Sequence, residues 1–330
     1  MSDQDDFGLN NVFEEPPRPP TPPPTFTTYH RNTKSPGAGA NSSKWSSINV
    51  QLVGHHVLWA QHLWNAAIVL ADFLDDHSSD LCRGKTVLEL GAGGALPSLV
   101  AALCGAHQVV ITDYPDAPLL ENIARNVDHN IPSTMRNVVK IQVSKPNKAP
   151  GQLLNGVDLL EKGYIWGTDP EKLSECLERG HISEDNNDTG THEHPSQSGR
   201  FDVIILSDLI FNHSQHAALL DTCEATLRLD RQDESVAHKV VDSAGSELAD
   251  HEGITPQIVS PCVLVFFSHH RPRYTSRDLE FFTRARGRGW VCEQVVRTKM
   301  NAMFPNDPGD EEVRSTVHGW VLRRPNTTTP

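Results

Sequence analysis

The sequence is short of positive charge: 29 Lys and Arg residues stand against 42 Asp and Glu residues, a formal net charge of −13. Binding to nucleic acid or to an anionic membrane surface needs clustered Lys and Arg, so we expect neither partner. No apolar run approaches the roughly 20 residues that span a bilayer. The start, Met-Ser-Asp-Gln-Asp-Asp, lacks the basic and apolar profile of a secretory signal. We therefore expect a cytoplasmic protein.

Paired cysteines are also lacking. The six Cys residues are scattered singly, at positions 82, 104, 176, 223, 262 and 292, and no two form a Cys-x-x-Cys pair. This excludes a disulfide scaffold and a Cys-based zinc site, and it predicts reduced thiols in the core. His213 and His216 are three residues apart, but no acidic or Cys ligand follows at a useful spacing. We expect no metal site.

Proline, in contrast, is concentrated near the start. Seven of the nine positions from 16 to 24 are Pro, and prolines cannot donate the hydrogen bonds of a helix or a strand. The sequence predicts a flexible arm over residues 1–45, followed by a single domain over residues 46–330. Stretches near 145–160, 178–199 and 229–260 are polar and lack periodicity, so we interpret them as surface insertions.

Short apolar segments alternate with amphipathic ones in the rest of the chain. Strands are expected at 85–90, 108–113, 163–166, 201–206, 262–267, 290–296 and 317–322. Helices separate the first five strands and follow the fifth, which is typical of a parallel sheet covered on both faces. No helix separates the last two strands, so they should form an antiparallel hairpin at one edge. The fold class is therefore a doubly wound α/β sheet.

Acidic residues end three of the apolar strands. Glu89 and the loop from Gly91 to Gly93 follow the first strand, Asp113 ends the second, and Asp208 follows the fourth. Sheets of this kind bind ligands at the carboxyl ends of their strands, and glycines let a ligand approach the backbone. A ligand with a ribose and a positive charge fits these acids. S-adenosylmethionine (SAM) has both, and a nicotinamide dinucleotide is the main rival.

Three segments together carry a more specific resemblance: TDYPD at 112–116, GYIWG at 163–167 and SDLIFNHSQH at 207–216. They resemble class I SAM-dependent methyltransferases, and in particular the fungal elongation factor methyltransferase 7 family. That family methylates the N-terminal amine (Gly) and the adjacent Lys of translation elongation factor 1-alpha. The resemblance spans roughly residues 50–325. It implies a seven-stranded, Rossmann-like fold, SAM as cofactor and that protein as substrate, and we expect a monomer.

The resemblance also implies which residues contact the cofactor. They are Trp64, Gly91, Ala92, Gly93, Asp113, Trp166 and Ser207. The glycine loop would pass under the methionine moiety, and Asp113 would accept the ribose hydroxyls. Trp166 and Ser207 would contact adenine, and Trp64 would offer a π face to the sulfonium. Trp59 is a second candidate for this last role.

Asp208 and Phe211 are the predicted catalytic pair. A protein amine needs a group that takes or orients its proton and an apolar wall that excludes water. A pyridine nitrogen has no proton to lose at neutral pH, so an acid would have less to do there. Protein amine methylation is therefore favoured over the alternative, a nicotinamide N-methyltransferase. A non-catalytic SAM-fold module should have lost the glycine loop or Asp113, and both are present.

Overall fold

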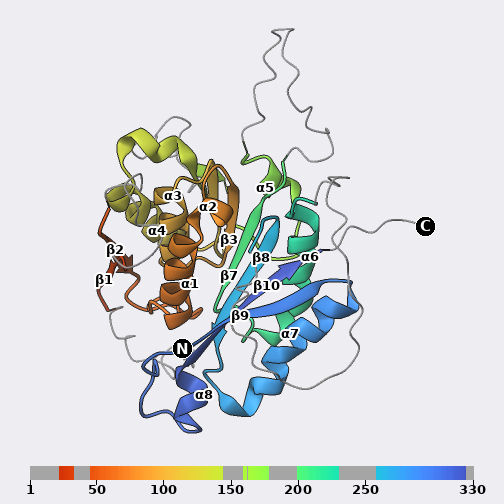
Figure 1. Ribbon diagram of the computed structural model, residues 1–330. Helices are drawn as coiled ribbons and strands as arrows, with labels where there is room; N and C mark the ends of the chain where they lie inside the picture. The colour runs from red at the N-terminus through yellow and green to blue at the C-terminus, as the bar shows by residue number, and fades with distance from the viewer. Residues whose placement is uncertain are drawn as a thin grey trace, which may run out of the picture.

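A computed structural model describes residues 22–32, 45–143, 159–161, 163–177, 199–229 and 258–324. Within this part of the chain, eight strands form one central sheet (Figure 1). They are β3 (Thr86–Leu90), β4 (Gln108–Ile111), β5 (Val139–Val143), β6 (Leu159–Glu161), β7 (Val203–Ser207), β8 (Cys262–Ser268), β9 (Val291–Lys299) and β10 (Thr316–Arg323). Their order is β6-β5-β4-β3-β7-β8-β10-β9.

The first six strands of that order are parallel, and β10 runs antiparallel to both β8 and β9. The predicted fold class is confirmed: a doubly wound sheet with an antiparallel hairpin at one edge. The short strand β6 adds an eighth strand to the seven that were expected.

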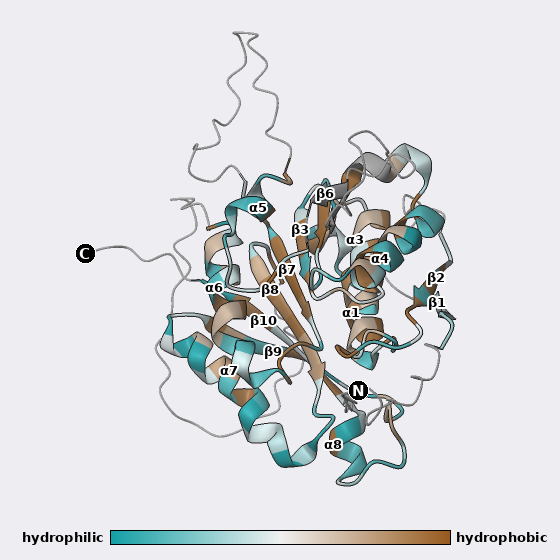
Figure 2. Cartoon of the chain, turned by 180° about the vertical axis from the view of Figure 1, so that it is seen from behind, coloured by the Kyte–Doolittle hydropathy of each residue, from teal (hydrophilic) through white to brown (hydrophobic). Residues whose placement is uncertain are grey.

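Helices cover both faces of the sheet (Figures 1 and 2). One face carries α1 (Asn65–Asp76), α3 (Leu96–Leu103) and α4 (Ala117–Asn130), and the other carries α5 (Glu171–Ser174), α6 (His216–Thr226) and α7 (Thr275–Gly287). In β7, Val203 and Ile205 pack with the first group and Ile204 and Leu206 with the second. Because both faces are buried, the sequences of such strands are continuous apolar runs. The short helix α2 (Ser78–Leu81) buries Leu81 in the same core as α1 and α3, and the short helix α8 (Glu311–Ser315) directly precedes β10.

The third predicted strand is wrong. Residues 163–166 form a loop without strand pairing, and the third strand of the sheet is β5. The loop is held close to the end of β4, because the Tyr164 N–H donates to the Asp113 carbonyl at 2.9 Å. The sequence of β5 alternates apolar and polar residues, so it lacks the continuous apolar run of its neighbours. The predicted insertion at 145–160 is wrong at its end, because β6 begins at Leu159.

A small second sheet corrects the prediction of a flexible arm over residues 1–45. Strand β1 (Thr25–His30) pairs antiparallel with β2 (Ser47–Leu52). The buried Tyr29 donates its hydroxyl to Asp72 of α1 at 2.6 Å, and Arg31 makes two bonds of 2.7 Å to Asp75. These contacts fasten the segment to the domain. The rest of the predicted arm, residues 1–21 and 33–44, lies outside the described residues.

Three asparagines of α4 attach β2 to the domain. Asn126 accepts from the Gln51 N–H at 2.7 Å and donates to the Gln51 carbonyl at 2.8 Å. Asn130 makes the same pair of contacts with Asn49, and Asn122 adds a bond to the Gln51 carbonyl. Spaced four residues apart, these amides share one helix face and satisfy backbone groups of β2 that no other strand satisfies.

The predicted insertions at 178–199 and 229–260 lie almost wholly outside the described residues. At the end of the second one, Ile258 is buried in the core beside the β1–β2 side of the sheet, so the insertion ends earlier than predicted. All six cysteines are free thiols, as the spacing predicted, and four of them are buried. No helix in the described ranges is both long and apolar enough to cross a membrane.

Candidate functional site

A cavity of about 520 Å³ lies at the carboxyl ends of β3, β4 and β7; we call it the strand-end cavity. All seven residues for which a cofactor contact was predicted line it: Trp64, Gly91, Ala92, Gly93, Asp113, Trp166 and Ser207. The second candidate Trp59 lines it as well. The parallel strands bring these residues together, because their carboxyl ends share one edge of the sheet.

The glycine loop leaves space for a ligand in this cavity. Gly91 and Gly93 have φ values of +63° and +54°, which disfavour any side chain. A Cβ at Gly91 would also lie 2.7 Å from Leu209. The N–H of Ala92 already donates to the Thr112 carbonyl, and the N–H of Gly93 donates to the Asp113 carboxylate at 2.7 Å.

Asp113 and Ser207 offer the polar groups of the strand-end cavity. The two oxygens of Asp113 accept one backbone N–H each, from Gly93 and Tyr114, which leaves each oxygen able to accept a hydroxyl. Burial raises the pKa of Asp113 although these two bonds lower it. The Ser207 Oγ is buried and has no partner among the described residues. Buried polar atoms are normally paired, so a ligand with hydroxyls and hydrogen-bonding ring edges fits both residues.

Glu89 does not face the cavity, and the prediction that it would meet a cationic ligand is wrong. Its side chain is fully buried and points to the start of α3, where the Ser98 N–H donates to it at 3.1 Å. The first N–H groups of a helix lack partners within the helix, so Glu89 serves the helix instead. Burial raises the pKa of Glu89 to about 8.

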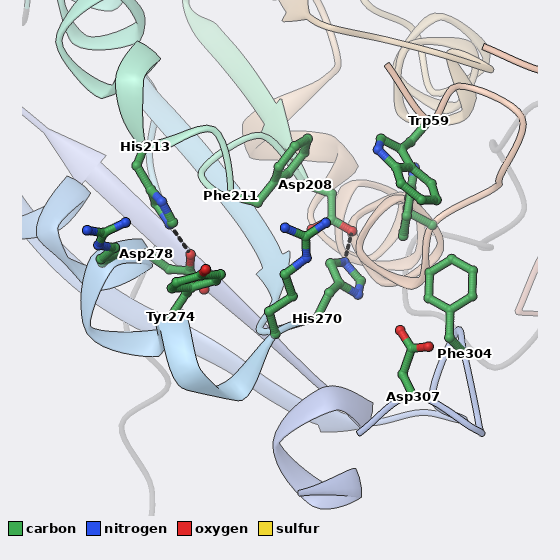
Figure 3. Close-up of a pocket in the computed structure, with 12 residues that line it drawn as sticks. Trp59, Asp208, Phe211, His213, His270, Tyr274, Asp278, Phe304 and Asp307 are labelled. Atoms are coloured by element: carbon green, nitrogen blue, oxygen red, sulfur yellow. Dashed lines mark hydrogen bonds and ion pairs between the residues drawn. The ribbon is translucent and has the colours of Figure 1, made fainter. Parts of the chain in front are cut away.

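A second cavity, of about 330 Å³, adjoins the first; we call it the loop cavity (Figure 3). Four segments that are distant in the sequence build it, within residues 59–64, 208–213, 270–278 and 304–307. The two cavities share Trp59, Trp64, Asp208 and Phe211. A group in the loop cavity can therefore approach a ligand in the strand-end cavity at these four residues.

Asp208, one of the two predicted catalytic residues, is held rigidly where the cavities meet. Its φ is +56°, a strained value for a residue other than glycine, and Trp59 has a similar φ of +63°. The Asp208 side chain is buried and accepts from His270 Nε2 at 2.8 Å and from the Ser268 N–H at 3.4 Å. Phe211, the other predicted residue, is about half exposed.

Aromatic rings form the remaining wall of the loop cavity. The ring centre of Trp64 lies 4.8 Å from that of His270 and 6.0 Å from that of Phe304. Trp59 lies 6.3 Å from Phe304. The π faces and edges of such rings can surround a cation at low cost in desolvation.

His270 and Phe304 line the loop cavity but were not predicted from the sequence. His270 follows β8 as Asp208 follows β7, and these strands pair in parallel with Ser207 opposite Phe266, so the same strand-end rule would have placed His270 at the site. Its neighbour His269 turns the other way and bonds to Asp278 at 2.6 Å. Phe304 lies in the connection between β9 and α8 and carries no such signal. The described residues hold no group of three metal-ligating side chains.

Comparison with known proteins agrees with this geometry. A family model for lysine methyltransferases matches residues 50–159. The protein N-terminal and lysine N-methyltransferase EFM7 of Cryptococcus neoformans is 36% identical over 322 residues, covering 97% of this chain and 89% of that protein. The protein of the same name from Schizosaccharomyces pombe is 34% identical, with 98% and 99% of the two chains covered. The chain belongs to this family.

It is thus a methyltransferase, and the family expected from its segments is confirmed. A solved structure of a putative RNA methyltransferase from Pyrococcus horikoshii is 14% identical, with a TM-score of 0.41, and covers 89% of this chain and 94% of that chain. That similarity is too weak to carry an argument. The strand order of the methyltransferase and its full-length relatives assign the fold.

Proposed function

We propose that this methyltransferase uses SAM to methylate the N-terminal α-amine and the adjacent Lys of translation elongation factor 1-alpha. One observation carries the proposal: a strand-end cavity suited to a ribose shares Trp64 and Asp208 with an adjoining loop cavity lined by aromatic and charged side chains. The names of the relatives support amine methylation on proteins. The resemblance to elongation factor methyltransferases supports the particular substrate.

On the cofactor side, each of the proposed contacts has a physical reason. SAM supplies a methyl group activated by a sulfonium. Asp113 accepts the ribose hydroxyls with its two remaining lone pairs, and Ser207 gains a partner for its buried Oγ. Trp166 covers adenine, while Gly91 and Gly93 leave room for the methionine moiety. Trp64 lies on both cavities and turns an aromatic face to the positive charge.

On the substrate side, the free energy needed to deprotonate the amine decides how much help the amine needs from the protein. Reference pKa values are about 10.4 for Lys and about 7.7 for an α-amine, so deprotonation at pH 7.4 costs about 4 kcal/mol for Lys and about 0.4 kcal/mol for the terminus. The terminus needs little more than positioning. A Lys also needs an apolar wall and an acceptor for its proton, and Phe211 and Asp208 lie where they can contribute to both.

The rim of the cavities favours a protein substrate over a small molecule. Val57, Leu58, Tyr114 and Ile165 are large apolar residues that line the strand-end cavity and are substantially exposed. Together with Phe211 they form an apolar border of the kind that marks interaction surfaces. A pyridine such as nicotinamide would leave this border uncovered.

Methyl transfer to matched peptides tests the proposal. The substrate is a peptide with the N-terminal sequence of elongation factor 1-alpha; one control peptide has an acetylated terminus and another has Arg in place of the adjacent Lys. Mass spectrometry should show both modifications on the parent peptide and one on each control. Methylation of nicotinamide with no methylation of any peptide would support the small-molecule alternative instead.

The proposal includes a monomeric enzyme that acts in the cytoplasm, where the substrate functions. Light scattering after size-exclusion chromatography should give the mass of one chain. Microscopy of a fluorescent fusion should show a cytoplasmic signal, and a dimer or a signal confined to an organelle would contradict these two points.

A further inference from the structure

His270 stands out among the groups of the loop cavity because of its link to Asp208 (Figure 3). Its Nε2 lies 2.8 Å from Asp208 Oδ2, and the two side chains are 17% and 4% exposed. An ionised carboxylate only accepts hydrogen bonds, so Nε2 carries a hydrogen, and in the neutral ring Nδ1 carries the lone pair. Among the described residues, Nδ1 makes no hydrogen bond. His270 therefore has a free basic nitrogen within the cavity.

The other titratable and charged groups of the loop cavity come from three segments: His213; Arg271, Tyr274, Arg277 and Asp278; and Asp307. Burial lowers the pKa of His270, but the charge and the hydrogen bond of Asp208, with a smaller effect of Asp278, outweigh burial and the opposing Arg271. The pKa of His270 is raised above its ordinary value. A proton acceptor is most effective when its pKa lies near the working pH.

Two other histidines are less suited to take a proton in this cavity. His213 Nε2 is already bonded to Asp278 at 2.7 Å, and Asp278 is shared with His269. His62 lines the strand-end cavity rather than the loop cavity, and burial lowers its pKa. Asp208 has one oxygen bonded to His270 and the other to the Ser268 N–H. His213 has the same kind of link to a carboxylate, but His213 and Asp278 line only the loop cavity. His270 alone among these histidines contacts both Asp208 and Trp64, which line the two cavities together and so lie beside the strand-end cavity.

Resting on the function proposed above, we infer that His270 is the catalytic base that accepts the proton of the substrate ammonium, and that Asp208 acts through it as a positioning residue. One N–H bond of the ammonium breaks and leaves its electron pair on nitrogen. The proton binds to Nδ1, and the resulting imidazolium is stabilised by the Asp208 carboxylate. The neutral amine is then the nucleophile, and His270 later returns the proton to solvent.

The test is the pH profile of the His270→Gln variant with the peptide whose terminus is acetylated, so that only Lys can react. Gln keeps an N–H donor for Asp208 but cannot take a proton. At pH 7.5, kcat/KM for Lys should fall by about 100- to 10,000-fold. The wild-type profile should level off above the pKa of His270. The variant must use the free amine in solution, so its rate should rise about tenfold per pH unit up to pH 9.5.

Two controls separate this role from a structural one. His270 does not line the strand-end cavity, so SAM affinity, measured by calorimetry, should change less than about threefold in His270→Gln. In the Asp208→Asn variant, the rate should reach its plateau at a lower pH than in the wild type, because the neutral amide no longer raises the pKa of His270. If His270→Gln binds SAM poorly, the same pH profile is measured with His270→Asn and interpreted in the same way.

Several outcomes would overturn the inference. A His270→Gln profile that matches the wild type would show that the imidazole takes no proton, and a loss by one constant factor at every pH would show a structural role only. Either result, with an active wild type, leaves the proposed function standing. A wild-type protein that methylates neither the α-amine nor Lys would overturn the proposed function and this inference with it.

Discussion

The strand-end cavity and the loop cavity meet at four residues, but the chain builds them in different ways. The polar floor of the first comes from residues just after β3, β4 and β7, and backbone hydrogen bonds hold its acid, Asp113; segments 57–67 and 164–166 complete its walls. The second is assembled from loops, and side-chain bonds such as that of Asp208 with His270 hold its groups. Strand ends of a parallel sheet are a rigid platform, while loops on such a platform can vary with the substrate. This difference suggests that binding of SAM and handling of the amine can be changed separately.

The largest expected effect is on the loop cavity. Replacing Asp208 with Ala removes the carboxylate that orients His270, and Lys methylation should fall by about 100- to 10,000-fold. Methylation of the α-amine should fall less, because about a third of that amine is neutral at pH 7.4. Mass spectrometry of the two control peptides measures each rate, and calorimetry should find SAM affinity retained. Equal losses at both amines would contradict the proposal that Lys depends on Asp208 more than the α-amine does.

Glu89, which lies beside the strand-end cavity but does not line it, should affect stability rather than binding. Its pKa is about 8 in the folded state against an ordinary 4.5, so folding favours the protonated form. The stabilising contribution is present below pH 4.5 and is lost as pH rises through 8. Urea unfolding should show Glu89→Gln more stable than wild type by a few kcal/mol at pH 8.5, with little difference near pH 4.5. The same difference at both pH values would contradict this.

Asp113→Ala tests the strand-end cavity, as Asp208→Ala tests the loop cavity. If Asp113 accepts the ribose hydroxyls as proposed, its loss should leave them unpaired, at a cost of about 1–3 kcal/mol, or 10- to 100-fold in SAM affinity. At saturating SAM, the KM for the peptide should stay close to that of the wild type, since Asp113 does not line the loop cavity. Unchanged SAM affinity in a folded variant would exclude Asp113 as the ribose acceptor.

The smallest expected effect concerns the aromatic wall. Phe304→Ala removes a ring that lines only the loop cavity, and an aromatic contact contributes about 0.5–1.5 kcal/mol. The KM for the peptide should rise about three- to tenfold while SAM affinity stays the same. Phe304→Tyr, which keeps the ring, is the matched control. A weaker affinity for SAM in Phe304→Ala would mean that the two cavities are coupled.

The glycine loop, Asp113 and Ser207 of the strand-end cavity could be predicted from the sequence, because they lie at the ends of strands with continuous apolar sequences, whereas Trp64 and Trp166 were expected only from the family resemblance. Where predictions from the sequence were wrong, the local sequence pattern was compatible with more than one structure. The residues 163–166 are apolar enough for a strand but form a loop beside Asp113, and Glu89 follows the pattern of a strand-end acid but bonds to the start of α3. Strand β1 was hidden by the neighbouring prolines, although Tyr29 sits at a buried position of it.

The sequence by itself determined the strands with continuous apolar runs, the parallel sheet they form, its antiparallel hairpin and the edge at which ligands bind. Hydrophobic periodicity and strand-end residues are local properties, and parallel strands place their ends together without further information. Only the tertiary structure decided that His270 meets Asp208 and that Phe304 closes the wall beside Trp64. These contacts join segments separated by 62 residues in the first pair and by most of the domain in the second. No local pattern encodes such distances, because they depend on how the loops pack once the sheet has formed.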